Sequence, residues 1–144
     1  MNAIDMLRQD HRRVENLFKQ YEAAQGSDER KRQIGEEACA ELEIHADLEQ
    51  EDFYPAVQVV GLEGADLIVD AEREHDAVKG LISKLRRLHA DAKEYDAVFA
   101  QLQQLVEQHV GFEEEKIFPY AEEILKADDL DHIAHRMSER KAAG

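Results

Sequence analysis

The sequence contains few of the residues that form cross-links, sharp turns or membrane spans. Its single cysteine, Cys39, excludes an internal disulfide and fits a reducing compartment. Two prolines, seven glycines and no tryptophan in 144 residues are typical of a helical protein, and the length fits one domain, residues 1–144. No apolar run approaches the about 20 residues that span a bilayer, and the N-terminus lacks the apolar core of a secretion signal. We therefore expect a cytoplasmic protein that does not bind membranes.

Positive charge is also scarce. Lysine and arginine number 18 against 33 aspartate and glutamate residues, which gives a formal net charge of −15. A chain with this charge could not neutralise a row of phosphates, so nucleic acid is not expected as a partner. The acidic residues are spread over the expected helix surfaces, where they favour solubility. They permit a protein partner but do not indicate one.

Apolar residues recur at alternating steps of three and four, the spacing of helices that pack in a bundle. We predict helices over about residues 3–24, 29–54 and 65–90, a fourth helix that follows a turn near Asp91 and runs up to Pro119, and a short C-terminal fifth helix over about 128–141. Pro55 and Pro119 should kink or end the second and fourth helices. Short connections between long helices predict an all-α fold, an antiparallel up-down-up-down four-helix bundle.

A shift of the sequence by 64 positions places its histidines on one another. The matched pairs are His11 and His75, His45 and His109, and Glu49 and Glu113. A repeat that keeps histidine and glutamate while their neighbours change indicates metal-ligand chemistry as well as packing. The repeat also predicts two helix pairs related by an approximate internal twofold axis.

The repeated histidines and glutamates lie on the helix faces that we expect to be buried. His45 and Glu49, like His109 and Glu113, are four residues apart, so each pair stacks one turn apart on a helix. Four imidazoles and two carboxylates are costly to bury in an apolar interior, and metal ions remove this cost. Nitrogen and oxygen donors without thiolate suit iron, manganese or zinc, and two carboxylates able to bridge favour a two-metal centre.

This arrangement resembles the hemerythrin-like family, also known as the HHE cation-binding domain, over about residues 3–125. The motifs that carry the resemblance are His11, His45-x-x-x-Glu49, His75 and His109-x-x-x-Glu113. The resemblance implies a non-haem di-iron cofactor, two iron ions joined by an oxo or hydroxo bridge. It also implies that Glu49 and Glu113 bridge the ions and that the histidines are terminal ligands.

The resemblance further implies a protein that binds or reacts with O₂, peroxide or NO, in sensing, detoxification or iron handling. The alternative is a metal-storage or metal-responsive interaction module without turnover, which needs the same ligands. The sequence therefore does not decide whether the protein is an enzyme.

One position departs from the oxygen-carrying members of the family. Their third helix supplies two histidines four residues apart, and here the residue four before His75 is Ala71. Two side chains are candidates for the missing ligand: Glu72, near the same helix face, and Tyr54, which precedes a proline. The alternative for Glu72 is a solvated charge. For Tyr54 it is simple aromatic packing, because the residue 64 positions later is Phe118.

Asp10 and Glu74 precede the first and third repeated histidines in matched fashion. They are either hydrogen-bond partners of metal-bound imidazoles or salt-bridged acids on the surface. His89 lies more than two turns beyond any expected ligand, so we expect it to be a packed or edge imidazole.

Overall fold

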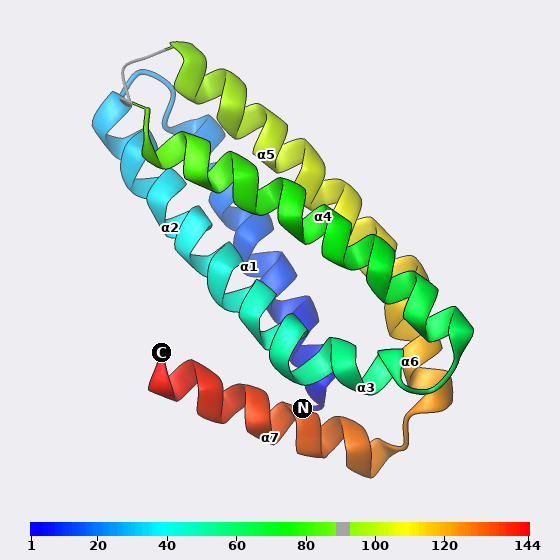
Figure 1. The fold of residues 1–144 in the computed structure, drawn as a ribbon. Helices are drawn as coiled ribbons and strands as arrows, with labels where there is room; N and C mark the ends of the chain where they lie inside the picture. The colour runs from blue at the N-terminus through cyan, green and yellow to red at the C-terminus, as the bar shows by residue number, and fades with distance from the viewer. Residues whose placement is uncertain (89–92) are drawn as a thin grey trace.

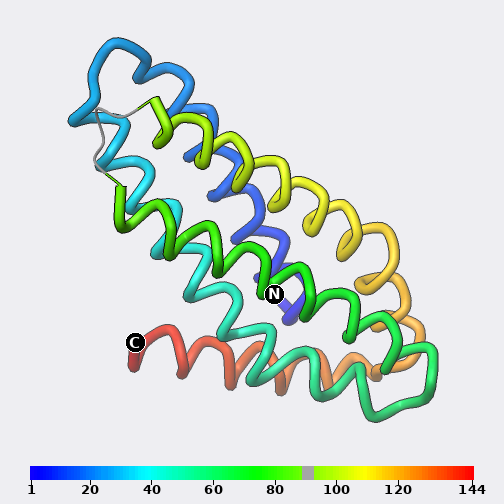
Figure 2. Tube along the Cα trace, turned by 45° about the horizontal axis from the view of Figure 1, so that its top comes forward, coloured from blue at the N-terminus to red at the C-terminus, as the bar shows by residue number. Residues whose placement is uncertain are grey.

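The computed structural model describes residues 1–88 and 93–144, and every regular element within these ranges is helical. The long helices are α1 (Ala3–Ala23), α2 (Asp28–Leu48), α4 (Leu62–Arg86) and α5 (Lys93–Phe112). They lie side by side, and α7 (Ala127–Ala143) crosses the end of this assembly that holds the N-terminus (Figure 1, Figure 2). Two short helices, α3 (Tyr54–Gln58) and α6 (Phe118–Ile124), follow α2 and α5 in the chain, each after one π-helical turn. The expected all-α fold is confirmed.

The first two helices begin within one residue of their predicted starts because each start carries a recognisable cap. The Asn2 side chain accepts a hydrogen bond from the Asp5 amide at 2.9 Å, and the Asp5 carboxylate accepts one from the Asn2 amide at 3.0 Å. The Ser27 hydroxyl accepts a hydrogen bond from the Arg30 amide at 3.3 Å. These bonds satisfy amide groups that have no partner within the first helical turn.

α4 begins at Leu62, three residues before its predicted start. The prediction treated Gly61 and Gly64 as a loop, but Gly64 is buried in the first turn of the helix. A Cβ atom at Gly64 would lie 2.4 Å from the carbonyl oxygen of Val57, so glycine is what allows α4 to pass this close to α3. The predicted C-terminal end of this helix and His89 fall in residues 89–92, outside the part of the chain that the structure describes.

The helix geometry before each proline differs from the predicted kink or helix end. A π-helical turn covers Glu49–Phe53, and a second covers Glu113–Ile117. In each turn the amide that precedes the proline donates to a carbonyl five residues back, from Tyr54 to Glu49 and from Phe118 to Glu113. A proline cannot donate to the helix and its ring would press on the carbonyl four residues back, so a widened turn accommodates it. Each π turn begins at one of the two repeated glutamates.

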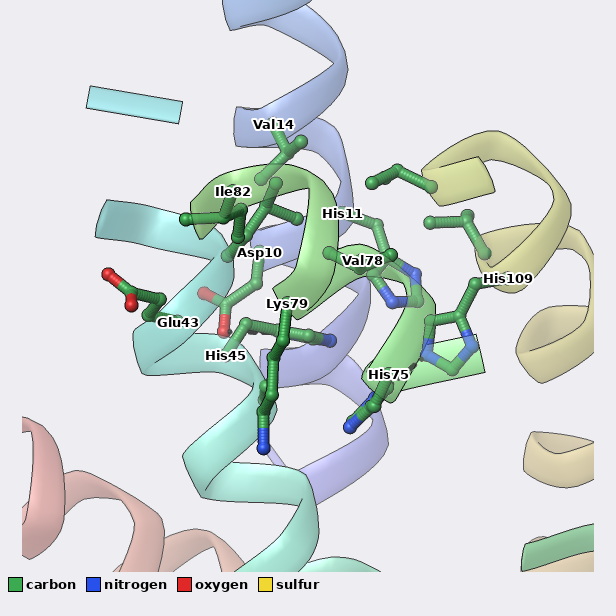
Figure 3. Close-up of a pocket in the computed structure, with 14 residues that line it drawn as sticks. Asp10, His11, Val14, Glu43, His45, His75, Val78, Lys79, Ile82 and His109 are labelled. Atoms are coloured by element: carbon green, nitrogen blue, oxygen red, sulfur yellow. Dashed lines mark hydrogen bonds and ion pairs between the residues drawn. The ribbon is translucent and has the colours of Figure 1, made fainter. Parts of the chain in front are cut away.

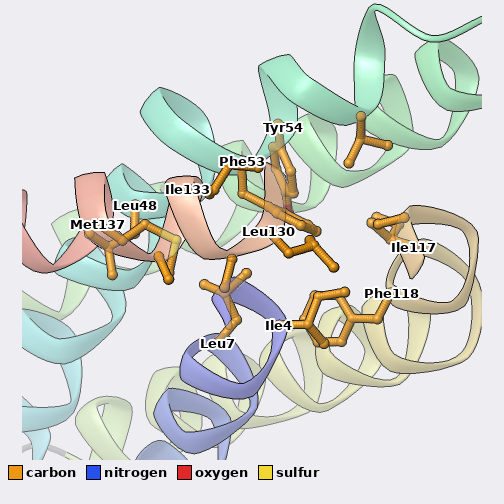
Figure 4. Packing of buried hydrophobic residues seen from close by; sticks show 14 of the residues in the cluster. Ile4, Leu7, Leu48, Phe53, Tyr54, Ile117, Phe118, Leu130, Ile133 and Met137 are labelled. Carbon is orange, nitrogen blue, oxygen red and sulfur yellow. The ribbon is translucent and has the colours of Figure 1, made fainter. Parts of the chain in front are cut away.

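Two clusters of buried apolar side chains lie on either side of a buried polar layer. Along α1, Ile4 and Leu7 belong to the first cluster, His11 follows, and Val14 and Phe18 belong to the second. The first cluster lies where α7 packs against α1 and α2 (Figure 4). The polar layer contains Asp10, His11, His45, Glu49, His75, His109 and Glu113. Two independent apolar cores therefore hold the helices in place above and below these residues.

Among the described residues, no helix is both long enough and apolar enough to cross a lipid bilayer.

Candidate metal centre

All six residues predicted as metal ligands converge in the buried polar layer. Their donor atoms form two groups of four, and within each group the atoms lie within 4.8 Å of one another. The first group is His11, His45, Glu49 and Glu113, and the second is Glu49, His75, His109 and Glu113. Both carboxylates thus belong to both groups. Each carboxylate side chain is 0% exposed, so neither reaches solvent.

Each carboxylate lies between histidines of two different helices. Glu49 Oε1 is 3.2 Å from His45 Nε2 and 2.9 Å from His75 Nε2. Glu113 Oε1 is 3.0 Å from His11 Nε2 and 3.4 Å from His109 Nε2. All four histidines therefore direct the same ring nitrogen, Nε2, into the centre of the cluster. The widened turns that begin at Glu49 and Glu113 place these carboxylates on the inner face just before the chain reaches its prolines.

The other ring nitrogen of three histidines faces a carboxylate. His45 Nδ1 lies 3.0 Å from Asp10 Oδ2, and His109 Nδ1 lies 2.7 Å from Glu74 Oε1. A carboxylate can only accept, so each Nδ1 donates its N–H and the lone pair of a neutral ring remains on Nε2. The structure thus makes Asp10 and Glu74 hydrogen-bond partners of histidines, the first of the two interpretations of the sequence.

The partner of His11 was not recognised from the sequence. His11 Nδ1 lies 3.4 Å from Glu114 Oε2, and Glu114 is in turn paired with Arg12. The 64-residue shift hides this contact because the residue that corresponds to Glu114 is Gln50. The corresponding nitrogen, His75 Nδ1, has no hydrogen-bond partner among the described residues.

The C-terminal helix holds Asp10 from the other side. Lys141 Nζ donates to Asp10 Oδ1 at 2.9 Å, and the Arg140 guanidinium forms two hydrogen bonds to buried Asp52, at 2.8 and 3.1 Å. Burial raises the pKa of Asp10, but the hydrogen bonds from His45 and Lys141 outweigh it and lower the pKa. Asp10 is therefore an anion that orients His45, and α7 contributes to the site through a contact 131 positions apart in the sequence.

Of the two candidates for an additional ligand, Tyr54 joins the cluster and Glu72 does not. The Tyr54 hydroxyl donates to Glu113 Oε2 at 2.6 Å and lies 3.2 Å from His75 Nε2. Its side chain is 1% exposed, and burial together with the Glu113 carboxylate raises its pKa well above the ordinary value. Glu72 is exposed on α4. Ala71 packs in the first apolar cluster.

Comparison with known proteins identifies the family. Residues 2–121 match the family model described as Hemerythrin HHE cation binding domain. The chain belongs to this family. An uncharacterized protein of Mycobacterium tuberculosis is 26% identical over 97% of this HHE chain and 85% of its own length. A DNA nickase of Nostoc is 28% identical over 99% of this chain, which spans only 39% of the nickase.

A solved structure of an HHE cation binding domain-containing protein from Mycobacterium kansasii shares the fold. Its TM-score is 0.84 at 24% sequence identity, and the match covers 99% of this chain and 89% of that protein. The hemerythrin-like fold expected from the sequence is therefore confirmed, and α7, which lies beyond the family match, is included in the structural match.

The buried donors of this HHE domain fit metal cations. Among the described side chains, His45 Nε2 and Glu49 Oε2 are buried without a hydrogen-bond partner, and His75 Nε2 lies only 3.1 Å from His109 Nε2. Nitrogen lone pairs directed at one another and at carboxylates repel unless a positive charge lies between them. The donor set of imidazole and carboxylate without thiolate suits iron, manganese or zinc.

The ring pKa values show how strongly the HHE site attracts positive charge. Burial would lower the pKa of His109, but the Glu113 carboxylate and hydrogen bonds to Glu49 and Glu74 raise it to about 10. Burial would also lower the pKa of His45, and the Glu49 carboxylate raises it well above the ordinary value. Without metal, the two buried carboxylates therefore draw protons onto the histidines, and a metal cation supplies the same charge without protons.

A small cavity adjoins the histidine side of the cluster. Its volume is about 40 Å³, and its lining combines the four site histidines with apolar side chains from all four long helices (Figure 3). The valines among them are Val14, Val78, Val106 and Val110. This space beside the histidines is large enough for a molecule of a few atoms. Most of the cavity wall around such a molecule would offer no hydrogen-bond partner.

Proposed function

We propose that this HHE domain holds two iron ions as its cofactor. Six residues would bind them: His11, His45, Glu49, His75, His109 and Glu113. The observation that carries the proposal is that Glu49 and Glu113 belong to both donor groups, because a carboxylate shared in this way can bridge two ions. Each group then supplies two further imidazoles of its own. Two-metal carboxylate sites inside helix bundles are typical of iron and manganese, and the resemblance to the hemerythrin-like family favours iron here.

The proposed function of the iron centre is to bind or react with O₂, peroxide or NO. Bound iron would supply the electrons and the open coordination positions that this chemistry needs. The chain supplies the rest: it holds the imidazoles in one orientation through Asp10 and Glu74, and it excludes water with two apolar clusters. The cavity beside the histidines favours this function over metal storage, because storage needs no space for a second ligand.

The same proposal includes the finer architecture. The four long helices form an antiparallel up-down-up-down bundle built from two related helix pairs, and the chain acts as a single domain. The π turns at Glu49 and Glu113 support this duplication, because they are 64 positions apart and each ends two residues before a proline.

Anaerobic loading with ferrous iron tests the function. We expect the loaded protein to change its absorption spectrum when NO or O₂ is admitted, and to do so in proportion to the iron bound. A protein that loads iron but shows no spectral change with O₂, NO or peroxide would be a storage or interaction module. The Glu49→Gln variant, which should bind little iron, serves as the reference for changes that do not involve the site.

Replacing Tyr54 by Phe tests whether its phenol completes the second donor group. The variant should still fold and bind iron, because phenylalanine stands at the position 64 residues later. We expect the ferric wild-type protein to show a visible charge-transfer band from an iron-bound phenol, and the variant to lose it. Loss of the 2.6 Å hydrogen bond to Glu113 should also lower the unfolding free energy by about 1 kcal/mol.

Tyr120→Phe is the matched control, because Tyr120 packs against the apolar cluster beside the site and has no side-chain hydrogen bond among the described contacts. A visible band that survives in Tyr54→Phe, or that is absent from the wild-type ferric protein, would show that the phenol is not an iron ligand.

A further inference from the structure

The cavity beside the histidines reaches the surface on one side of the molecule. The lining residues that are exposed or half-buried come only from α2 and α4: Leu42, Glu43, Ala46 and Lys79. All lining residues from α1 and α5 are buried. Figure 3 shows Glu43 and Lys79 on these two helices, with His45 and His75 close to Lys79 in this view. The mouth of the cavity therefore lies between α2 and α4.

Side-chain size explains why the opposite side is closed. Residues 64 positions apart occupy corresponding places, and Phe18 of α1 corresponds to Ile82 of α4, while Val110 of α5 corresponds to Ala46 of α2. Phe18 is 2% exposed, and its ring meets the Phe99 ring edge-on at 5.7 Å between centroids. A surface groove over α1 and α5 is lined by Phe18 and contains none of the histidines. Smaller side chains on the α2–α4 side leave the passage open.

The size and the lining of the cavity restrict what can pass. A volume of about 40 Å³ is only a few times the 10–15 Å³ that one water molecule requires. The walls between the mouth and the histidines are Leu42, Ala46, Val78 and Ile82, which offer no side-chain hydrogen bond to an entering molecule. A hydrated ion would have to give up its water here without compensation, whereas a weakly polar molecule would not.

We infer that the gap between α2 and α4 is the entrance by which a weakly polar molecule of two or three atoms reaches the histidines, and that Ala46 and Val78 set its width. The inference rests on the proposed function for the identity of the ligand class, which is dioxygen or nitric oxide. The position of the entrance is inferred only from the residues that line the cavity and from their exposure. Ala46 and Val78 line this passage and supply no donor atom to the proposed metal site, so the size of their side chains sets the width of the entrance.

The entrance is tested with two probes, one of which does not depend on iron. Crystals of the wild-type protein under xenon pressure should show xenon in the cavity, because small apolar cavities take up this gas. With ferrous iron bound, the rate of NO association should fall in Ala46→Trp by about tenfold to a hundredfold, within the roughly one to three decades over which variants of one binding site change their association rates. Val78→Ala should raise the rate, because it widens the same passage.

Ala77→Trp is the matched control, because Ala77 is exposed on α4 and does not line the cavity. The natural chain contains no tryptophan, so indole fluorescence shows directly whether the ring at position 46 is sheltered. If Ala46→Trp does not fold, the xenon experiment and the NO association rate of Val78→Ala still test whether the entrance lies between α2 and α4. Iron content is measured for every variant, so that a change of rate is compared at equal loading.

The outcomes separate the entrance from the proposed function. Xenon in the cavity of a protein that loads iron but ignores NO would support the entrance and refute the function. Full iron loading with equal NO rates in wild type, Ala46→Trp and Val78→Ala would refute the entrance and leave the function standing. Absence of xenon from the wild-type cavity would also overturn the entrance, whatever the iron does.

Discussion

Glu49→Gln is expected to remove most of the iron from the protein while leaving its helices folded. Glu49 is fully buried, and its carboxylate approaches histidines of both donor groups, at 3.2 Å for His45 Nε2 and 2.9 Å for His75 Nε2. An amide has nearly the same shape but carries no charge, so it neutralises neither cation and binds metal poorly. Loss of an outer hydrogen-bond partner typically costs about 10- to 100-fold in metal affinity, so a shared ligand should cost at least about 100-fold.

The measurement is iron per chain after loading and dialysis, with circular dichroism as the check on folding. Glu51→Gln is the matched control: Glu51 lies in the same π turn, two residues further on, and its side chain is exposed. The control should load as the wild type does. If Glu49→Gln retains full iron through dialysis, Glu49 is not a ligand and the assignment of a shared carboxylate is wrong.

Removal of the metal should lower the melting temperature by at least about 10 °C. Ligand present at a thousand times its dissociation constant stabilises the folded state by about 4 kcal/mol per site. For a chain of this size each kcal/mol corresponds to roughly 3 °C. Calorimetry of iron-loaded and chelator-treated protein measures the difference, and addition of iron to the treated protein should restore it. An unchanged melting curve after iron has been removed would show that metal binding is not linked to folding.

The metal-free protein should nevertheless stay helical at temperatures below its lowered melting temperature. The apolar clusters on the two sides of the site contain none of the six histidine and glutamate ligands, and they bury large side chains, among them Leu7, Phe53, Phe99 and Leu102. Each fully buried side chain of this kind contributes about 1.5–3 kcal/mol relative to exposure. The site itself, in contrast, brings together buried charges whose repulsion the metal relieves. We therefore expect metal binding to stabilise the buried polar layer between the two apolar clusters more than the clusters themselves.

The features that the sequence predicts well depend on spacing along the chain. Steps of three and four identify the long helices, and an interval of four between His45 and Glu49 places both side chains on one face. The 64-residue shift adds the information that two such pairs face the same interior, and the structure brings all six predicted residues together. Local spacing and the repeat thus sufficed to predict that these six residues converge.

The features that the sequence did not predict depend on contacts between distant residues or on local departures from α-helix. Lys141 reaches Asp10 across 131 positions, and no periodicity connects them. Only one half of the repeat has a glutamate at the position of Glu114, which contacts His11. A comparison of the two halves therefore does not reveal this contact. The π turns before Pro55 and Pro119 leave the spacing of apolar residues almost unchanged. The apolar spacing and the prolines therefore predict a kink or a helix end, whereas the chain forms one widened helical turn.

Anomalous diffraction from crystals of iron-loaded protein, recorded on both sides of the iron absorption edge, tests the two-iron site most directly. We expect two anomalous peaks above the edge that vanish below it, one within reach of His11 and His45 and the other within reach of His75 and His109. Glu49 and Glu113 should lie between the two peaks. A single peak, peaks that persist below the iron edge, or iron bound away from these residues would contradict the proposed di-iron centre.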